Sequence, residues 1–373
     1  MKFDDLSRYP LKLKQNRVRR PFVGGNLLDE WQGKKNSEDG NMPEEWVSST
    51  IEARNTSYIP NEGLSRVEIY TGEIIFLRDI IASDPVSFLG EKHVAKHGDN
   101  ISVLVKILDS YSRLMIQVHP DNAFAKKVFN SDFGKTEAWY IIGGRKVNGD
   151  DPYVLLGFKP GITREKWKRL FEKQDIKGME DALHKFTVKP GDIFFVEGGV
   201  PHAVGTGCFL MEIQEPTDFT IRTEKTSPIG LPISELQMHQ NAGFDKMFDC
   251  FHYNGFTREE VLGKWHITHQ VVKDESGSKL SWIISPQYTT YFSIMGIETV
   301  KSFTTPRAQT FSSVVVISGK GRLLWDGGEL AINQSDELFL PVGIGDINWE
   351  SCGGQKLVAV RCFPPAGTAA GIT

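Results

Sequence analysis

Apolar residues fall into several short runs along the chain, and turns rich in glycine, proline or polar residues separate them. Alternation and β-branched or aromatic content predict strands at residues 103–108, 114–119, 134–140, 192–196 and 208–214. The segment Lys189-Pro190-Gly191-Asp192 is a tight turn directly before one of these strands. This density of short strands and turns is typical of a jelly roll.

The hydrophobic period changes to that of a helix between two groups of strands. Thr163 is a favourable N-cap residue for such a helix. The apolar residues that follow it share one helical face: Trp167, Leu170 and Phe171. Residues 178–183 suggest a second short helix. We therefore interpret residues 121–184 as a part-helical insertion within the strand-rich region.

The last third of the chain repeats an earlier pattern. Residues 192–202 align without gaps with residues 336–346, and a strand and turn of similar style precede the second copy. The alignment places Asp346 where His202 stands, and no histidine follows His269. A second jelly roll that holds no metal is therefore expected near the C-terminus.

These patterns predict a mainly β protein of two barrels. The first barrel is expected to combine residues 1–120 with residues 185–230, on either side of the insertion. Residues 231–284 would connect it to a second barrel over residues 285–373.

Composition and charge exclude several classes of protein. The chain has 40% hydrophobic residues, 24% charged residues and a net charge of -4, as in an ordinary soluble globular protein. It has no dense basic block and no long apolar run, so neither a nucleic-acid nor a membrane partner is expected. Its four cysteines show no CxxC pair and no disulfide-type spacing, which fits a reducing cytosol. We expect a cytoplasmic protein and favour a monomer.

Polar side chains on or beside the predicted strands form a candidate metal site. Gln117 and His119 are two positions apart on a strand and therefore point to one face. Glu137 lies in another predicted strand, and His202 follows a third. Two imidazoles, a carboxylate and an amide oxygen suit a divalent metal in a β-barrel.

The alternative is that these histidines only pack in the core, and spacing alone does not separate the two interpretations. Lys135 and Arg222 flank the set, and glycine-rich turns lie beside His202, which favours a functional site.

Five segments together resemble the type I mannose-6-phosphate isomerases, which consist of two cupin-type barrels. They are Leu104-Val105-Lys106-Ile107-Leu108-Asp109, Ile116-Gln117-Val118-His119-Pro120-Asp121, Gly134-Lys135-Thr136-Glu137, Pro201-His202-Ala203-Val204-Gly205, and Glu212-Ile213-Gln214 through Asp218 to Arg222. Pro10-Leu11-Lys12-Leu13-Lys14 and Glu44-Glu45-Trp46 resemble the start of the family more weakly, so the resemblance spans roughly residues 10–225 with the motifs in order. It implies a zinc enzyme that interconverts mannose 6-phosphate and fructose 6-phosphate through a cis-enediol.

The resemblance also implies a role for each site residue. It assigns one zinc ion to Gln117, His119, Glu137 and His202, catalysis to Arg222, active-site positions to Lys135 and Glu212, and a place near the phosphate to Lys106. Aldose–ketose isomerisation needs a positioned base and positive charge where the enediolate oxygen develops. Glu212 is the candidate base, and Arg222 and Lys135 are the candidate stabilisers.

Each of these assignments has a structural alternative. Glu212 and Arg222 would form an ion pair with no catalytic role, and Lys135 would be a solvated lysine at a strand edge. Glu44, near Trp46, is expected to be a surface carboxylate.

One departure from the family pattern leaves the substrate open. The family usually has a serine two residues before the ligand glutamine, whereas this chain has Met115, which cannot donate a hydrogen bond. The alternatives are therefore a sugar-binding cupin without turnover and an isomerase of a related sugar. A non-haem iron oxygenase could also use two histidines and a carboxylate, but Gln117 would fill a position that oxygen chemistry needs open.

Overall fold

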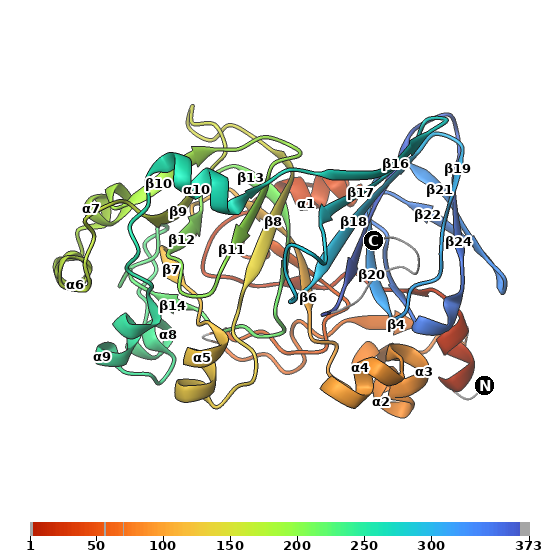
Figure 1. Cartoon of the computed structure of the whole chain (residues 1–373), viewed down its shortest axis with the longest axis horizontal. Helices are drawn as coiled ribbons and strands as arrows, with labels where there is room; N and C mark the ends of the chain where they lie inside the picture. The colour runs from red at the N-terminus through yellow and green to blue at the C-terminus, as the bar shows by residue number, and fades with distance from the viewer. Residues whose placement is uncertain (1–2, 56, 70, 366–373) are drawn as a thin grey trace.

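The computed structural model describes residues 3–55, 57–69 and 71–365, and it is mainly β (Figure 1). One seven-stranded sheet has the order β15 (His266–Ile267), β11 (Ile193–Val196), β8 (Glu137–Gly144), β13 (Cys208–Gln214), β6 (Leu104–Ser110), β3 (Glu44–Val47) and β2 (Arg17–Val18). A five-stranded sheet has the order β10 (Leu183–Thr187), β9 (Tyr153–Phe158), β12 (His202–Val204), β7 (Gln117–Val118) and β14 (Ile221–Arg222). Strands of these two sheets carry the predicted site residues except His119, which directly follows β7, and Lys135, which lies two residues before β8.

Two further sheets contain the C-terminal strands, drawn in blue at the right of Figure 1. The larger has the order β1 (Leu11–Lys12), β23 (Glu337–Leu340), β20 (Ser312–Ser318), β25 (Leu357–Phe363), β18 (Ser293–Thr299), β17 (Ser278–Ile284) and β16 (Gln270–Glu275). The smaller has the order β19 (Ser302–Thr305), β24 (Ile347–Ser351), β21 (Lys320–Trp325) and β22 (Gly328–Asn333), and a hairpin joins β4 (Arg66–Glu68) to β5 (Ile74–Phe76).

The helices lie around the sheets (Figure 1). They are α1 (Asn26–Trp31), α2 (Leu77–Ser83), α3 (Pro85–Leu89), α4 (Glu91–His97), α5 (Asn122–Phe124), α6 (Arg164–Lys173), α7 (Ile176–Asp181), α8 (Glu235–His239), α9 (Phe244–Met247) and α10 (Arg258–Trp265). A π-helical turn, Ala125–Phe129, follows α5, and short 3₁₀ turns cover Phe3–Arg8, Phe248–Cys250 and Val342–Ile344. Among the described residues, none of the helices has the length and apolar content needed to cross a bilayer.

The two seven-stranded sheets share one apolar core. Val105 and Ile213 of one sheet belong to the same buried cluster as Val315 and Val360 of the other. Because neighbouring residues of a strand point to opposite faces, Lys106 and Glu212 point away from this core. They line a cavity on the other face of their sheet. The shared core thus holds rigid the strands from which the site residues project.

The helix that the sequence predicts directly after Thr163 is confirmed. The Thr163 hydroxyl accepts a hydrogen bond from the Lys166 backbone N–H at 3.3 Å, and Trp167 and Phe171 are buried. The second helix begins two residues earlier than predicted because Asp175 caps it, and Leu183 already belongs to a strand.

Two predicted strands differ from the observed ones. Residues 103–108 and 114–119 fall in different sheets, and the second strand shrinks to Gln117–Val118. The reason is a buried ion pair between Arg113 and Glu224 at 2.7 Å. The Glu224 carboxylate also accepts the Ile116 N–H at 2.6 Å, so this backbone group bonds a side chain instead of a neighbouring strand.

The repeated sequence pattern corresponds to similar local structure. Residues 193–196 and 337–340 both form strands. The side chain of Asp192 accepts from the Lys189 N–H at 2.8 Å, and that of Asp336 accepts from the Asn333 N–H at the same distance. Equivalent turns therefore lead into equivalent strands.

The predicted division into domains stays a prediction, and the sheets refine it. Of the expected connecting segment 231–284, β15 pairs with β11 of the site-bearing sheet, and β16 and β17 belong to the sheet of the C-terminal strands. Within residues 121–184, β8 and β9 are interior strands of the two sheets that carry the site, so only the helical parts lie outside those sheets. At the N-terminus, β1 pairs with β23 and joins the C-terminal strands.

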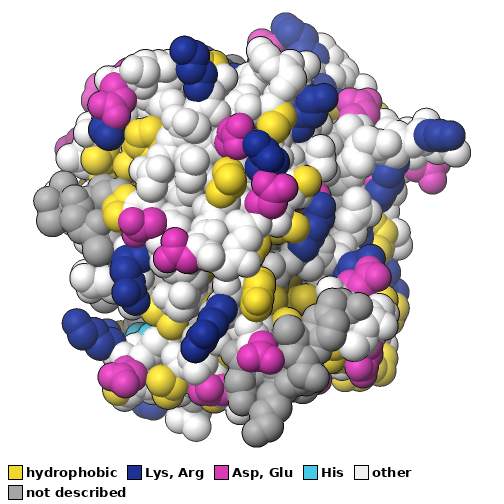
Figure 2. Space-filling view, turned by 90° about the vertical axis from the view of Figure 1, so that its right-hand side faces the viewer, with side chains coloured by type: hydrophobic (Ala, Val, Ile, Leu, Met, Phe, Trp, Pro, Cys, Tyr) yellow, Lys and Arg dark blue, Asp and Glu magenta, His cyan; other side chains and the backbone are white. Residues whose placement is uncertain are grey.

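The face at the right of Figure 1 carries charged side chains of both signs. Figure 2 shows Lys and Arg interspersed with Asp and Glu over this face, and hydrophobic side chains in small patches. No continuous basic surface of the kind that binds nucleic acid is visible on it.

Candidate active site

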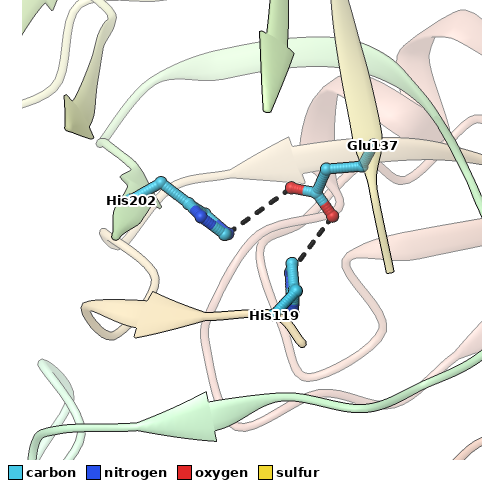
Figure 3. A group of neighbouring side chains, drawn as sticks. All are labelled: His119, Glu137 and His202. Carbon is cyan, nitrogen blue, oxygen red and sulfur yellow. Dashed lines mark ion pairs between the residues drawn. The ribbon is translucent and has the colours of Figure 1, made fainter. Parts of the chain in front are cut away.

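His119, Glu137 and His202 converge in the interior beside the two sheets (Figure 3). Glu137 begins β8 and His202 begins β12, while His119 directly follows β7. The ligand atoms of the three side chains lie within 4.8 Å of one another, and all three residues are buried. His119 Nε2 is 3.1 Å from Glu137 Oε2, and His202 Nε2 is 3.5 Å from Glu137 Oε1. It is the one such cluster found among the described residues.

Backbone carbonyls set the tautomer of both imidazoles. His119 Nδ1 lies 2.8 Å from the Phe219 carbonyl oxygen, and His202 Nδ1 lies 2.8 Å from that of Val200. Since a carbonyl only accepts, each Nδ1 carries the proton and each Nε2 lone pair is directed at the cluster. Burial and the Lys135 ammonium lower the pKa of His119 to about 3, and burial lowers the pKa of His202. Both rings are thus in the neutral form that binds metals.

Gln117 and Lys135 complete the surroundings of the cluster. The Gln117 amide lies 3.3 Å from His202 Nε2 and 3.5 Å from His119 Nε2. Rotation of this amide exchanges its nitrogen for its oxygen, so it can supply an oxygen ligand. Lys135 Nζ lies 2.7 Å from His119 Nε2 and contacts Glu137 Oε2. The lone pairs of the cluster therefore favour a positive charge, which the Lys135 ammonium supplies here. Two imidazoles, a carboxylate and an amide oxygen are donors that fit zinc.

A cavity of about 50 Å³ adjoins the cluster. Its charged lining residues are Arg20, Glu44, Lys106, Lys135, Glu212, Asp218 and Arg222. Gln117 and Met115 also line it. The structure thus brings Lys106, Lys135, Glu212 and Arg222 to one cavity, and the roles that the resemblance implies for them stay predictions.

Glu212 lies between two lysines. Its Oε1 is 3.0 Å from Lys106 Nζ and 3.8 Å from Lys135 Nζ. Burial and the nearby Glu137 carboxylate raise its pKa, and the two ammonium groups offset only part of this effect. The alternative pairing of Glu212 with Arg222 is not observed. Lys135 is buried, so the alternative of a solvated lysine at a strand edge is not observed either.

Three cavity residues were not assigned roles from the sequence: Arg20, Glu44 and Asp218. Arg20 bonds Glu44 at 2.8 Å and Asp218 at 3.1 Å, and its guanidinium lies over the Trp46 ring. The expectation that Glu44 is a surface carboxylate is wrong, because β3 pairs with β6 and turns this side chain inward. Glu44 and Trp46 are two positions apart on one strand, and this spacing could have indicated that they share a face. In the structure the Trp46 indole N–H donates a hydrogen bond to Glu44 at 2.8 Å.

Arg222 lies at the edge of the cavity on β14. Its Nη1 donates to the Gln237 carbonyl at 2.9 Å and to the Thr220 carbonyl at 3.3 Å. Burial lowers the pKa of Arg222 to about 10, so the side chain stays charged at neutral pH. Among the described residues no carboxylate forms an ion pair with it, and its charge is available to a ligand.

Comparisons with known proteins identify close relatives. Residues 32–137 match the family described as phosphomannose isomerase type I, catalytic domain. The chain is 31% identical over 255 residues to a probable mannose-6-phosphate isomerase, GmuF, of Bacillus subtilis, across 68% of this chain and 73% of that protein. It is 27% identical over 256 residues to the mannose-6-phosphate isomerase ManA of the same organism, with the same two coverages.

Solved structures share the fold. The mannose 6-phosphate isomerase from Bacillus subtilis superimposes with a TM-score of 0.72 at 20% identity, over 95% of this chain and 99% of that one. A zinc-bound mannose 6-phosphate isomerase gives a TM-score of 0.70 at 15% identity over the same fractions. The predicted mainly β fold is confirmed.

Proposed function

Because the chain belongs to the type I mannose-6-phosphate isomerase family, a family of aldose–ketose isomerases, we propose that it interconverts mannose 6-phosphate and fructose 6-phosphate with one zinc ion. The observation that carries the proposal is the position of Glu212. This buried carboxylate lies beside the His119, Glu137 and His202 cluster in a cavity lined by four cationic side chains.

Glu212 is the proposed base. It takes the proton from C2 of the open-chain aldose, and the electron pair of that bond forms the double bond of a cis-enediol. The former carbonyl oxygen O1 gains a proton in the enediol, and O2 then loses one to become the new carbonyl. The proton taken by Glu212 returns to C1 and gives the ketose. A carboxylate whose pKa is raised toward the working pH is suited to both steps, because it accepts and releases the proton readily.

Arg222 and Lys135 are the proposed electrostatic stabilisers. The enediolate oxygen develops negative charge, and cations fixed in a small, largely buried cavity stabilise such charge strongly. Lys106 is proposed to contact the substrate and also to hold the Glu212 carboxylate in place, since its Nζ is 3.0 Å from that group.

Gln117, His119, Glu137 and His202 would hold the zinc ion. When bound there, zinc supplies a Lewis acid that polarises a sugar oxygen or a water molecule. The cytoplasmic location and the monomeric state expected from the sequence stay predictions.

The test is a coupled assay with mannose 6-phosphate on the purified chain, before and after chelation and after zinc is added back. We expect turnover that chelation abolishes and zinc restores. The variant Glu212→Gln is the matched control, because it should keep the metal and lose turnover.

Two results would contradict the proposal. A zinc-loaded protein that binds the sugar phosphate without turnover would be a binding cupin. A protein purified with iron in place of zinc would favour the oxygenase alternative, and metal analysis separates these cases.

A further inference from the structure

A second cavity adjoins the first, and Pro21 and Arg222 line both. The volume of this outer cavity is about 290 Å³, against about 50 Å³ for the inner one. Its remaining wall comes from Arg54 and Asn55 on one side and from residues 234–241 around α8 on the other. Leu236 in this wall is 55% exposed, so the outer cavity reaches the surface. A ligand that enters the inner cavity thus also has room in the outer one.

The cations that line only the inner cavity are all paired with carboxylates. Arg20 bonds Glu44 and Asp218. Lys106 bonds Glu212, and Lys135 contacts Glu137. These pairs leave little net charge for a doubly charged anion.

The outer cavity has a different charge balance. Its two charged residues are Arg54 and Arg222, and within the described chain neither has a carboxylate at ion-pair distance. The Arg54 guanidinium rests on the Phe219 ring, 4.7 Å from its centroid, and the Phe219 ring stacks on Phe129. The Arg54 backbone N–H donates to Asp218 at 2.9 Å, which ties it to the segment that carries Arg222. The outer cavity therefore holds a fixed, uncompensated positive charge.

One further group in the outer cavity needs a ligand. Within the described residues the side-chain oxygen of Gln240 is buried and has no hydrogen-bond partner. Buried polar atoms are almost always paired, and a sugar hydroxyl would supply the missing donor.

We propose that the outer cavity binds the phosphate end of the substrate and that Arg54 is its main anchor, with Arg222 at the border between the two cavities. This inference rests on the proposed function, which places the reacting C1–C2 end at Glu212. The sugar then extends outward, and its terminal phosphate meets the guanidinium groups. In this arrangement Arg54, in the outer cavity, supplies the phosphate contact, and Met115, in the inner cavity, has no part in it.

The experiment compares Arg54→Ala and Arg54→Lys with a matched control, Arg258→Ala. Arg258 is also exposed, and its guanidinium lies over a phenylalanine ring, Phe186, at 4.3 Å, but it lines neither cavity. Arg54→Ala should raise KM for mannose 6-phosphate about tenfold or more, with kcat changed less than about twofold, as expected for loss of a charge-assisted hydrogen bond. Arg54→Lys should recover part of the loss, and Arg258→Ala should change nothing.

Two phosphate-specific measurements complete the test. Inhibition by inorganic phosphate should weaken by a factor similar to the rise in KM, and kcat/KM for unphosphorylated mannose should stay unchanged. An unchanged KM and unchanged phosphate inhibition in Arg54→Ala would overturn the inference while leaving the isomerase intact.

Binding of inorganic phosphate, followed by calorimetry on the zinc-loaded protein, separates the inference from the proposed function. If the wild type binds phosphate through Arg54 but turns over no mannose 6-phosphate, the anion site stands and the proposed function falls. If phosphate binds equally well to the wild type and Arg54→Ala, the anion site lies elsewhere and the inference is wrong.

Discussion

Lys106 and Glu212 face each other across the paired strands β6 and β13, with 3.0 Å between the ammonium nitrogen and a carboxylate oxygen. Both side chains are buried, 4% and 6% exposed. Removing one partner of such a pair leaves a buried charge and costs about 3–5 kcal/mol. We therefore expect Lys106→Met to lower the free energy of unfolding by about that amount, and the double variant Lys106→Met/Glu212→Leu to recover most of it. Urea denaturation measures both, and a loss below about 1 kcal/mol would show that Lys135 alone compensates Glu212.

Substitutions at His202, a proposed zinc ligand, and at Asp346, which aligns with it in the repeated pattern, test the metal site. His202→Ala should remove zinc and activity together, because an incomplete ligand set rarely holds the ion. Asp346→Ala is the control, since Asp346 aligns with His202 and its carboxylate accepts a hydrogen bond from the Arg307 backbone N–H. It should leave zinc content and turnover nearly unchanged. Full zinc occupancy in His202→Ala would contradict the ligand assignment, and loss of zinc in Asp346→Ala would contradict the metal-free second barrel.

Arg222 should affect the chemical step more than binding. If its charge stabilises the enediolate, Arg222→Ala should lower kcat on the order of 10²-fold or more while KM changes less. Arg222→Lys should restore only part of the activity, because an ammonium lacks the planar guanidinium, whose Nη1 now bonds the carbonyl oxygens of Thr220 and Gln237 and whose other nitrogens stay available to a ligand. Steady-state kinetics decides this, and a variant with normal kcat would exclude Arg222 from the reaction.

Met115→Ser restores the hydroxyl that the family usually has. With the phosphate held in the outer cavity, we expect KM for mannose 6-phosphate to stay within about threefold of wild type, well below the tenfold that one good hydrogen bond to a charged group provides. The variant should lose stability, because Met115 is 5% exposed in an apolar cluster and truncating a buried methionine costs about 2–5 kcal/mol. Met115→Leu controls for packing. A large fall in KM with serine alone would place the phosphate beside β7.

Glu337 should make stability depend on pH. Within the described residues both of its carboxylate oxygens are buried and without hydrogen-bond partners. Burial and the charge of Glu45 raise its pKa well above the ordinary 4.5. The folded state therefore holds a proton that the unfolded state releases, and stability falls as pH rises from about 4.5 through the folded pKa.

Glu337→Gln removes this contribution. The difference in unfolding free energy between the variant and the wild type should thus shift in favour of the variant between pH 5 and pH 8. Denaturation at both pH values measures it, with Glu329→Gln as the exposed control. An identical difference at the two pH values would mean that Glu337 is ionised throughout.

Several features followed from the sequence because they depend on residues close together in the chain. The helix behind Thr163 is an example, since its cap bonds a residue three positions away. The strand at 208–214 has the predicted bounds, because its mostly apolar sequence suits a strand that is buried on both faces. The shared direction of Gln117 and His119 follows from the strand period alone, and the ordered motifs identified the family.

Other features depended on contacts that no local pattern encodes. The strand predicted at 114–119 is shorter than expected because the Ile116 N–H bonds the Glu224 side chain, 108 positions away in the sequence. Glu44 is buried because Arg20 links it to Asp218, 198 positions from that arginine. The metal cluster itself closes only when His202 pairs with Gln117 across two strands of one sheet. Packing over the whole chain decides which charges are compensated, because electrostatic partners act through space and not along the sequence. It therefore also decides which arginine is free to bind a phosphate.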